Sequence, residues 1–272
     1  MAASAKGLPV RSRARARRRA LVLSVTAGAL ALSLAAAPAA PARSSAGLLV
    51  DGPVGNLSVS QWTALWWQWA YAPPVHNPPF TGPISNPLFD PTGAVCAVGQ
   101  AGPVWFLAGT STGGSVTRSC TVPAGVKLLI PLINIEGDNI GVVPPFSPSE
   151  LRAAVAAGID TVDELHLSVD GRSVPSDVLF DHRVQSPVFA YGLPPQDNAV
   201  QGFEDGQGYI FPVVSDGYWV LLNPLPAGDH VIDFGGAFSS GFSLDITYDL
   251  TVSPSGRPEA ASRSTRARVT AA

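Results

Sequence analysis

The sequence of 272 residues predicts a mainly β protein, folded as a single antiparallel β-sandwich or jelly-roll-like domain with a tryptophan-rich N-terminal helix and a short inserted helix. Two segments, 126–135 and 218–222, are apolar at both odd and even positions, which is typical of strands covered on both faces. Segment 244–252 instead alternates apolar and polar residues, as a strand with one wet face does. No strand–helix–strand rhythm indicates a parallel sheet.

The N-terminal end of the chain differs from this domain in composition. Residues 11–19 contain six arginines, and a run of small and apolar residues, 20–37, leads to Ala-x-Ala sequences that end at Ala39 and Ala42. This order predicts a signal peptide over 1–42 and therefore a secreted, extracellular protein. A run of eighteen residues is also long enough for an uncleaved membrane anchor, and Arg18-Arg19 leaves the export route open.

The domain itself is expected over 47–252, followed by a disordered tail over 253–272 that has four arginines, two prolines and no apolar periodicity. The whole chain carries a formal charge of −3, but residues 47–252 hold only 5 basic groups against 19 acidic ones, hence −14. Such a field repels nucleic acid and anionic lipid. A neutral polysaccharide or cell-envelope glycan, or a cation, is the partner that this charge allows, with no membrane contact after signal cleavage.

Cys96 and Cys120 are the only cysteines. An even number of cysteines in an exported protein predicts a disulfide. A metal site is the weaker interpretation, because neither cysteine has a histidine or carboxylate beside it.

Segment 60–71 predicts a helix that begins at Ser58 or Ser60 and ends before Pro73-Pro74. One helical face carries Trp62, Leu65, Trp66 and Trp69, and we expect this face to dock onto the sandwich. The opposite face carries Trp67 and Tyr71, which are the better ligand candidates. An exposed pair of aromatic rings can stack on sugars, although the following loop can equally cover it.

Two long loops are expected at the rim of the sandwich. Loop 73–93 contains seven prolines and His76, and loop 192–208 is rich in glycine, proline and acids. Between them, 103–109 and 116–122 read as the two strands of a hairpin. Ser147 and Glu150 form a capping box that predicts a short helix up to Gly158.

The most site-like feature is the end of the first two-sided apolar strand, where Glu136, Asp138 and Asn139 follow one another closely. Hard oxygen ligands at this spacing suit Ca²⁺, so these three residues form the predicted metal site. A turn that leaves a strand needs the same residue types, and the spaced Asp-x-Asp-x-Asp-Gly loop is missing.

Catalytic signatures are mostly absent from the sequence. It contains no Gly-x-Ser-x-Gly, no His-Glu-x-x-His, no His-x-His pair and no phosphate-binding loop. A carbohydrate hydrolase or lyase would need two carboxylates across a cleft. The candidates for that pair are Glu136, Asp138, Glu204, Asp205 and Asp216.

Five short patterns stand out in the chain: Trp62-x3-Trp66-Trp67-x-Trp69, Cys96-x3-Gln100-x-Gly102-x-Val104-Trp105-Phe106-Leu107, Val122-Pro123-Ala124-Gly125, Ser215-Asp216-Gly217-Tyr218-Trp219 and His230-x-Ile232-x-Phe234-Gly235-Gly236. In these patterns the chain resembles a group of secreted bacterial β-rich proteins of unknown function. The resemblance covers most of 57–252 and implies export and a β-rich domain, but no activity.

We therefore expect a secreted, non-catalytic β-sandwich that binds a glycan or cell-envelope polymer, with calcium assistance from the Glu136 group. The expected ligand-binding residues are Trp67, Tyr71, Glu136, Asp138 and Asn139. An extracellular carbohydrate-active enzyme and a purely structural secreted domain remain as alternatives.

Overall fold

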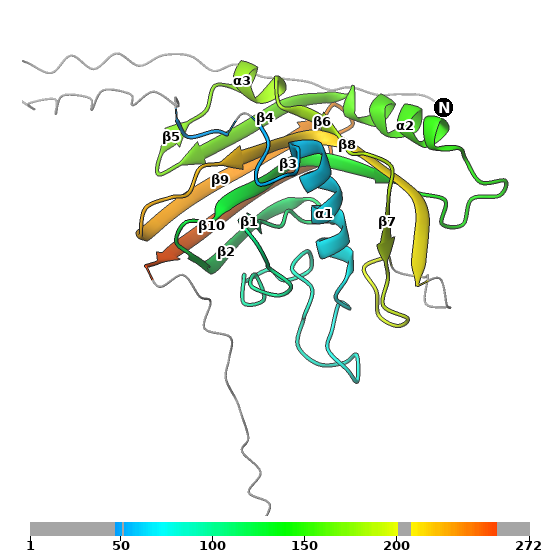
Figure 1. Ribbon diagram of the computed structural model, residues 1–272, viewed down its shortest axis with the longest axis horizontal. Coiled ribbons are helices and arrows are strands. Elements are labelled where there is room, and N and C mark those ends of the chain that lie inside the picture. Colours follow the sequence, from blue (N-terminus) through cyan, green and yellow to red (C-terminus); the bar gives the residue numbers. More distant parts are fainter. Residues whose placement is uncertain (1–46, 51, 201–207, 255–272) are drawn as a thin grey trace, which may run out of the picture. The chain divides into compact units, whose positions relative to one another are not determined.

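The computed structural model describes residues 47–50, 52–200 and 208–254, and it shows two five-stranded sheets packed face to face (Figure 1). The first sheet has the order β1-β3-β8-β6, with β7 also paired to β8, and the second has the order β2-β10-β9-β4-β5. The predicted signal peptide, 1–42, and the tail beyond 254 lie outside the described residues. The strands are β1 (Val104–Phe106), β2 (Gly114–Pro123), β3 (Lys127–Gly137), β4 (Val162–Val169), β5 (Arg172–Ser173), β6 (Arg183–Gln185), β7 (Phe189–Gly192), β8 (Tyr209–Leu222), β9 (Gly228–Phe238) and β10 (Ser243–Ser253).

Three helices accompany the sheets: α1 (Val59–Tyr71), α2 (Pro148–Ile159) and α3 (Ser176–Phe180). Helices α1 and α2 both begin with a complete capping box, at Ser58 and Ser147, as the serine and glutamine or glutamate spacing in the sequence indicates. None of the described helices has the length and apolar character needed to cross a bilayer.

The mainly β sandwich is confirmed, and its centre is the antiparallel pair β3–β8. On the inner side, Leu128 and Ile130 pack against the second sheet, while on the outer side Leu129 packs under α1 with Trp219 and Leu221. The two-sided apolar pattern therefore reflects a sheet that is the middle layer of three. Burying both faces of β3 and β8 makes this pair the main source of hydrophobic stabilisation.

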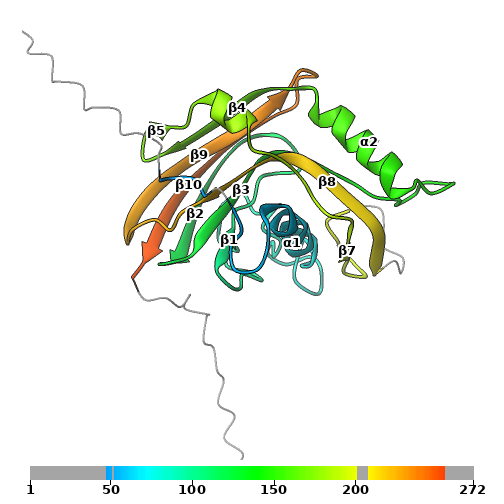
Figure 2. The same ribbon diagram turned by 45° about the horizontal axis from the view of Figure 1, so that its top comes forward.

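Helix α1 lies across the outer face of the first sheet, with β7 and β8 curving beside it (Figure 2). Three of its indole nitrogens donate to backbone carbonyl oxygens: Trp62 Nε1 to Val54 at 3.3 Å, Trp66 Nε1 to Leu107 at 2.8 Å and Trp69 Nε1 to Val98 at 2.7 Å. These bonds satisfy polar groups that burial would otherwise leave unpaired, and they fix the rotation of the helix on the sheet.

Two details of the predicted topology are wrong. The sheets are mixed rather than antiparallel throughout, because β1 pairs with β3, and β2 pairs with β10, in the parallel sense. The segments expected to form a hairpin belong to different sheets. Their burial explains this: 104–106 is buried at every position and suits the layer under α1, whereas 114–123 mostly alternates and suits the outer sheet with its wet face.

The predicted disulfide joins Cys96 to Cys120, with their Cα atoms 6.0 Å apart. It links the loop before β1 to strand β2 and is compatible with an extracellular protein. Near it, Arg118 is buried between the sheets and donates to the carbonyl oxygens of Asp90 at 2.7 Å, Ala108 at 2.6 Å and Gly109 at 2.9 Å. The segment 90–109, which contains β1, is thus attached to β2 both by the disulfide and by the hydrogen bonds of Arg118.

Candidate functional site

The residues predicted at the end of β3 face α1 because of a β-bulge. The pairing of β3 with β8 shifts between Pro131 and Ile133, and Leu132 and Ile133 both enter the core between the sheets. The shift reverses the parity of the strand, so Asn134 and Glu136 join Pro131 on the side of α1. Bulges commonly re-aim side chains next to functional sites, and here one turns a carboxyl group toward the aromatic layer.

Glu136 and Asp138 form a pair of neighbouring carboxyl groups close to Tyr71 at the end of α1. Asp138 also accepts from the backbone N–H of Ile140 at 2.7 Å on Oδ1 and from the hydroxyl of Tyr191, on β7, through a short bond to Oδ2. Glu136 Oε1, by contrast, is buried without a hydrogen-bond partner. Both carboxyl oxygens of Asp138 therefore accept hydrogen bonds, whereas Oε1 of Glu136 accepts none.

Burial, followed by the negative charge of Asp138, raises the pKa of Glu136 from 4.5 to about 9. Glu136 is therefore a neutral carboxylic acid at pH 7. Burial and the nearby carboxyl groups also raise the pKa values of Tyr71 and Tyr191, so both phenols stay protonated. A protonated acid held next to a carboxylate is the arrangement from which enzymes build acid–base pairs, and it also occurs in purely structural networks.

Three aromatic rings connect this pair to the helix. Tyr71 contacts Tyr191 edge to face, with ring centroids 4.8 Å apart, and Trp67 contacts Tyr71 at 5.2 Å. Trp67 is only 8 % exposed, so of the two outcomes that the sequence leaves open for this face of the helix, the covered one is observed. One face of α1 meets the first sheet, while β7 and the loops cover the other. The indole Nε1 of Trp67 is buried and makes no hydrogen bond.

A cavity of about 170 Å³ adjoins Trp67 and Tyr71. None of the described residues in its wall is charged: the wall combines aromatic and aliphatic groups with the hydroxyl-bearing residues Tyr71, Thr110 and Ser111 and one amide. The amide is that of Asn134, which makes no hydrogen bond with any described residue. The lining residues are Trp66, Trp67, Tyr71, Leu88, Phe89, Gly109, Thr110, Ser111, Pro131, Asn134, Ala199, Phe242 and Leu244.

Glycine at position 217 makes room for this amide. Asn134 and Gly217 are direct partners in the β3–β8 pairing, and a Cβ on Gly217 would lie 2.4 Å from Cβ of Asn134. Any side chain at position 217 would therefore push Asn134 and the bulged strand away from its present place.

The long loops hold the other side of the cavity. The side chain of Asn86 is fully buried and donates to the carbonyl oxygens of Ala70 at 3.0 Å and Pro73 at 2.9 Å, which ties loop 73–93 to the end of α1. The two loops also meet each other, because Asp197 accepts from the backbone N–H of His76 at 2.6 Å and lies 3.0 Å from its Nδ1. The contact between His76 and Asp197 therefore holds the two loops together in the part of the rim that the structure describes.

The remaining predicted residues do not join this group. The amide of Asn139 exchanges two hydrogen bonds with the backbone of Phe146, at 2.7 and 2.9 Å, and closes the loop 139–146. Asp216 is fully buried and paired with Arg183 at 2.8 Å, which is a structural ion pair. Glu204 and Asp205 lie outside the described residues.

For the predicted calcium site, the structure brings Glu136 and Asp138 together and directs Asn139 elsewhere. Both oxygens of Asp138 and the amide oxygen of Asn139 already accept hydrogen bonds, and Glu136 is neutral near pH 7. Calcium prefers several charged oxygen ligands. Occupation by calcium would therefore require these bonds to be exchanged and Glu136 to lose its proton.

Tyr191 and Asn134 belong to the site, and the sequence indicated neither of them. Tyr191 lies 53 residues from Asp138 on a short strand whose partner, β8, follows it in the chain. No local pattern marks it. Comparisons of the chain with protein-family models, with curated proteins and with solved structures gave no match.

Proposed function

We propose that this protein is a secreted, non-catalytic β-sandwich that binds a neutral glycan or cell-envelope polymer and takes one sugar ring into the cavity beside Trp67 and Tyr71. The observation that carries the proposal is the composition of the cavity wall, which joins aromatic rings to uncharged hydrogen-bonding groups. Sugar rings offer apolar C–H faces to aromatic side chains and hydroxyls to amides and alcohols.

The size of the cavity supports a single ring. A dry protein cavity of about 150 Å³ accepts one benzene molecule. A hexose has about twice as many non-hydrogen atoms as benzene, so a volume of about 170 Å³ receives one face of a single sugar ring, with its outer hydroxyl groups and the rest of a polymer lying outside. The free amide of Asn134, which lines the cavity, supplies hydrogen-bonding groups that a ring hydroxyl can satisfy.

Charge supports a neutral ligand in particular. The segment 47–252 carries 19 acidic against 5 basic residues, and no cationic side chain lines the cavity. An anionic polymer would meet repulsion on approach and no counter-charge at the wall. Neither Glu136 nor Asp138 lines the cavity, which favours binding over hydrolysis.

The test is titration of the purified protein with neutral mono- and oligosaccharides, followed by calorimetry and by tryptophan fluorescence, since Trp66 and Trp67 line the cavity. Asn134→Ala should weaken binding roughly 2- to 10-fold, the value of one neutral hydrogen bond. The matched control is Asn77→Ala, which removes an exposed amide in loop 73–93 and should leave the affinity unchanged. Absence of binding to every neutral saccharide, or equal effects of the two variants, would contradict the proposal.

A second candidate function, a carbohydrate-active hydrolase or lyase, is favoured by the raised pKa of Glu136 beside Asp138. It predicts new reducing ends when polysaccharide is incubated with the protein, and their disappearance in Glu136→Gln. Binding without reducing ends would exclude this candidate. The same titrations with added calcium and with a calcium chelator test the predicted calcium assistance.

A further inference from the structure

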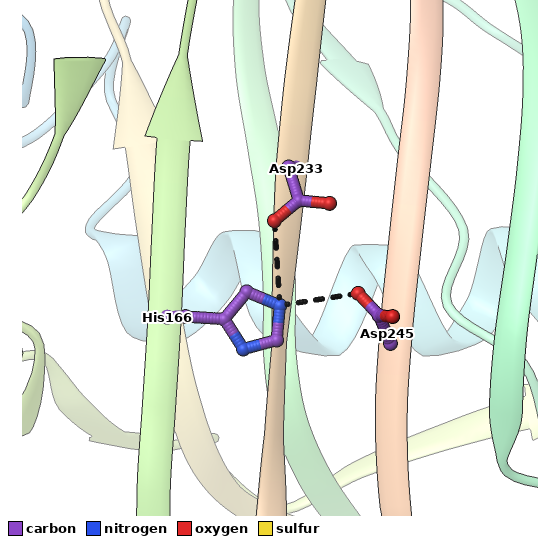
Figure 3. Close-up of side chains that lie close together, drawn as sticks. All are labelled: His166, Asp233 and Asp245. Atoms are coloured by element: carbon purple, nitrogen blue, oxygen red, sulfur yellow. Dashed lines mark ion pairs between the residues drawn. The ribbon is translucent and has the colours of Figure 1, made fainter. Parts of the chain in front are cut away.

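A second group of polar side chains lies on the outer, solvent-facing side of the second sheet, away from α1. His166 on β4, Asp233 on β9 and Asp245 on β10 come from three adjacent strands, and their side chains converge (Figure 3). Among the described residues, this is the only group of three metal-ligating side chains whose donor atoms all lie within 4.8 Å of one another.

Gly235 makes the convergence possible. In the sheet register it is the direct partner of both His166 and Asp245, so these two residues are separated by the width of β9. Two strand spacings amount to about 10 Å, and the imidazole bridges much of this gap by lying over the glycine. A Cβ at position 235 would come 2.7 Å from Cε1 of His166.

The carboxylates are held by hydroxyl groups on neighbouring strands. Thr247 donates to Oδ2 of Asp233 at 3.0 Å, and Ser115 donates to Oδ2 of Asp245 at 3.1 Å. The other oxygen of each carboxylate, Oδ1, is directed at Nε2 of His166, as the dashed lines in Figure 3 show. Nε2 itself is shielded from solvent and makes no hydrogen bond.

The distances fit metal ligands better than hydrogen bonds. Nε2 lies 3.6 Å from Oδ1 of Asp233 and 3.5 Å from Oδ1 of Asp245. A nitrogen–oxygen hydrogen bond is typically 2.7–3.2 Å long. Two ligands bound at 2.0–2.1 Å to one tetrahedral zinc ion stand about 3.3–3.4 Å apart, so small side-chain rotations would bring all three donors onto a shared ion.

We propose that His166, Asp233 and Asp245 bind a divalent transition-metal ion of the zinc class, with Thr247 and Ser115 as positioning residues. One imidazole and two carboxylates balance the charge of a divalent ion. The imidazole favours zinc over calcium or magnesium, which prefer oxygen ligands alone. Three protein ligands leave a fourth position for water or another ligand, as in open zinc sites.

The surroundings leave space for that fourth ligand. A hollow of about 360 Å³ is lined by His166 and Asp245 together with Glu164, which lies two residues before the histidine on the same face of β4. Glu164 adds negative charge beside the site and attracts cations. The alternative is that a protonated His166 pairs with the two aspartates and that no metal binds.

The experiment measures binding of Zn²⁺ to the purified, metal-stripped full-length chain by calorimetry, with the absorption spectrum of Co²⁺ as a report of tetrahedral coordination. We expect one ion per chain. His166→Ala and Asp245→Asn should each weaken binding at least about 100-fold, since loss of a hydrogen-bonded outer partner alone costs 10- to 100-fold. Thr247→Val should weaken it by about 10-fold while leaving the stoichiometry unchanged.

The matched control is His230→Ala, because His230 also pairs with an aspartate, Asp170, at 2.8 Å, on the same sheet. This variant should bind zinc as the parent does. Circular dichroism of the metal-free variants checks that they are folded. Zinc should raise the melting temperature of the parent and of His230→Ala equally, that of Thr247→Val by less, and that of His166→Ala and Asp245→Asn least. Equal binding by parent and His166→Ala, equal affinity for Ca²⁺ and Zn²⁺, or no saturable zinc binding would each overturn the proposal.

Discussion

Glu136→Gln should abolish a pH dependence of stability that the parent protein shows between about pH 5 and pH 8. Burial and the charge of Asp138 raise the pKa of Glu136 from 4.5 to about 9, so the folded state keeps a proton that the unfolded chain releases over this range. For a carboxyl group with a raised pKa, rising pH lowers the free energy of unfolding. This sign is opposite to that of a carboxylate held in a salt bridge.

The size of this change in the free energy of unfolding follows from the binding of one proton by Glu136. The free energy of unfolding should fall by about 1.4 kcal/mol per pH unit between the two pKa values, hence by roughly 2.7 kcal/mol between pH 6 and pH 8. Glutamine has nearly the same shape, remains neutral at all pH values and can donate to Asp138. The variant should therefore lack this slope and become more stable than the parent as the pH rises.

Urea unfolding at several fixed pH values, followed by tryptophan fluorescence, measures the effect as a difference between parent and variant, so other titrations cancel. Glu164→Gln, at an exposed position of β4, is the matched control and should track the parent. Carbon NMR of the Glu136 carboxyl gives the pKa directly. A constant difference between parent and Glu136→Gln from pH 5 to pH 8, or a carboxyl titrating near its usual 4.5, would refute the reasoning.

Three further predictions concern stability. Arg118→Met should lower the free energy of unfolding by about 3–5 kcal/mol, because three buried carbonyl oxygens lose their donor; urea unfolding with a loss under 1 kcal/mol would contradict this. Replacing Cys96 and Cys120 by serine should cost about 3 kcal/mol, given their sequence separation of 24, and reductant should then have no further effect on the melting temperature. Ser147→Ala should lower the free energy of unfolding by about 1 kcal/mol, because α2 loses its N-cap. Ser149→Ala, at the second residue of the same helix, should lower it by less in the same assay.

Local patterns predicted the elements of this fold well. The apolar runs that became β3 and β8 are buried on both faces, and the alternating run that became β10 has one wet face. The capping box at Ser147 marked the start of α2 to the residue. Each of these signals depends on neighbours within one strand or one helical turn, which a sequence displays directly.

Strand partners could not be read in the same way. The chain leaves β1 and enters β2 in another sheet, and both strands pair in parallel with segments farther along the sequence. A short turn rich in serine, threonine and glycine suits a hairpin equally well, so local chemistry does not separate the two outcomes. The difference lies in which faces are covered, and only the packed layers determine that.

The candidate sites divide in the same manner. Glu136 and Asp138 were predicted together because they are two residues apart, although the bulge that turns them toward α1 leaves no mark in the sequence. The sequence left open whether Trp67 is exposed or covered, because its burial depends on segments far along the chain, such as β7. The group of His166, Asp233 and Asp245 was not predicted. The period-two alternation of each strand indicates which residues face solvent, but it does not indicate which residues of three different strands lie next to one another in the sheet.

The bonds that hold loop 73–93 and the segment after it in place also position part of the cavity wall. Leu88 and Phe89, which form part of its wall, stand next to the Asp90 carbonyl held by Arg118, and the same stretch is joined to β2 through Cys96. In a reducing compartment the disulfide between Cys96 and Cys120 would be reduced. Reduction would loosen the segment that carries Leu88 and Phe89, so under the proposed function the oxidised protein should bind its ligand more tightly than the reduced protein.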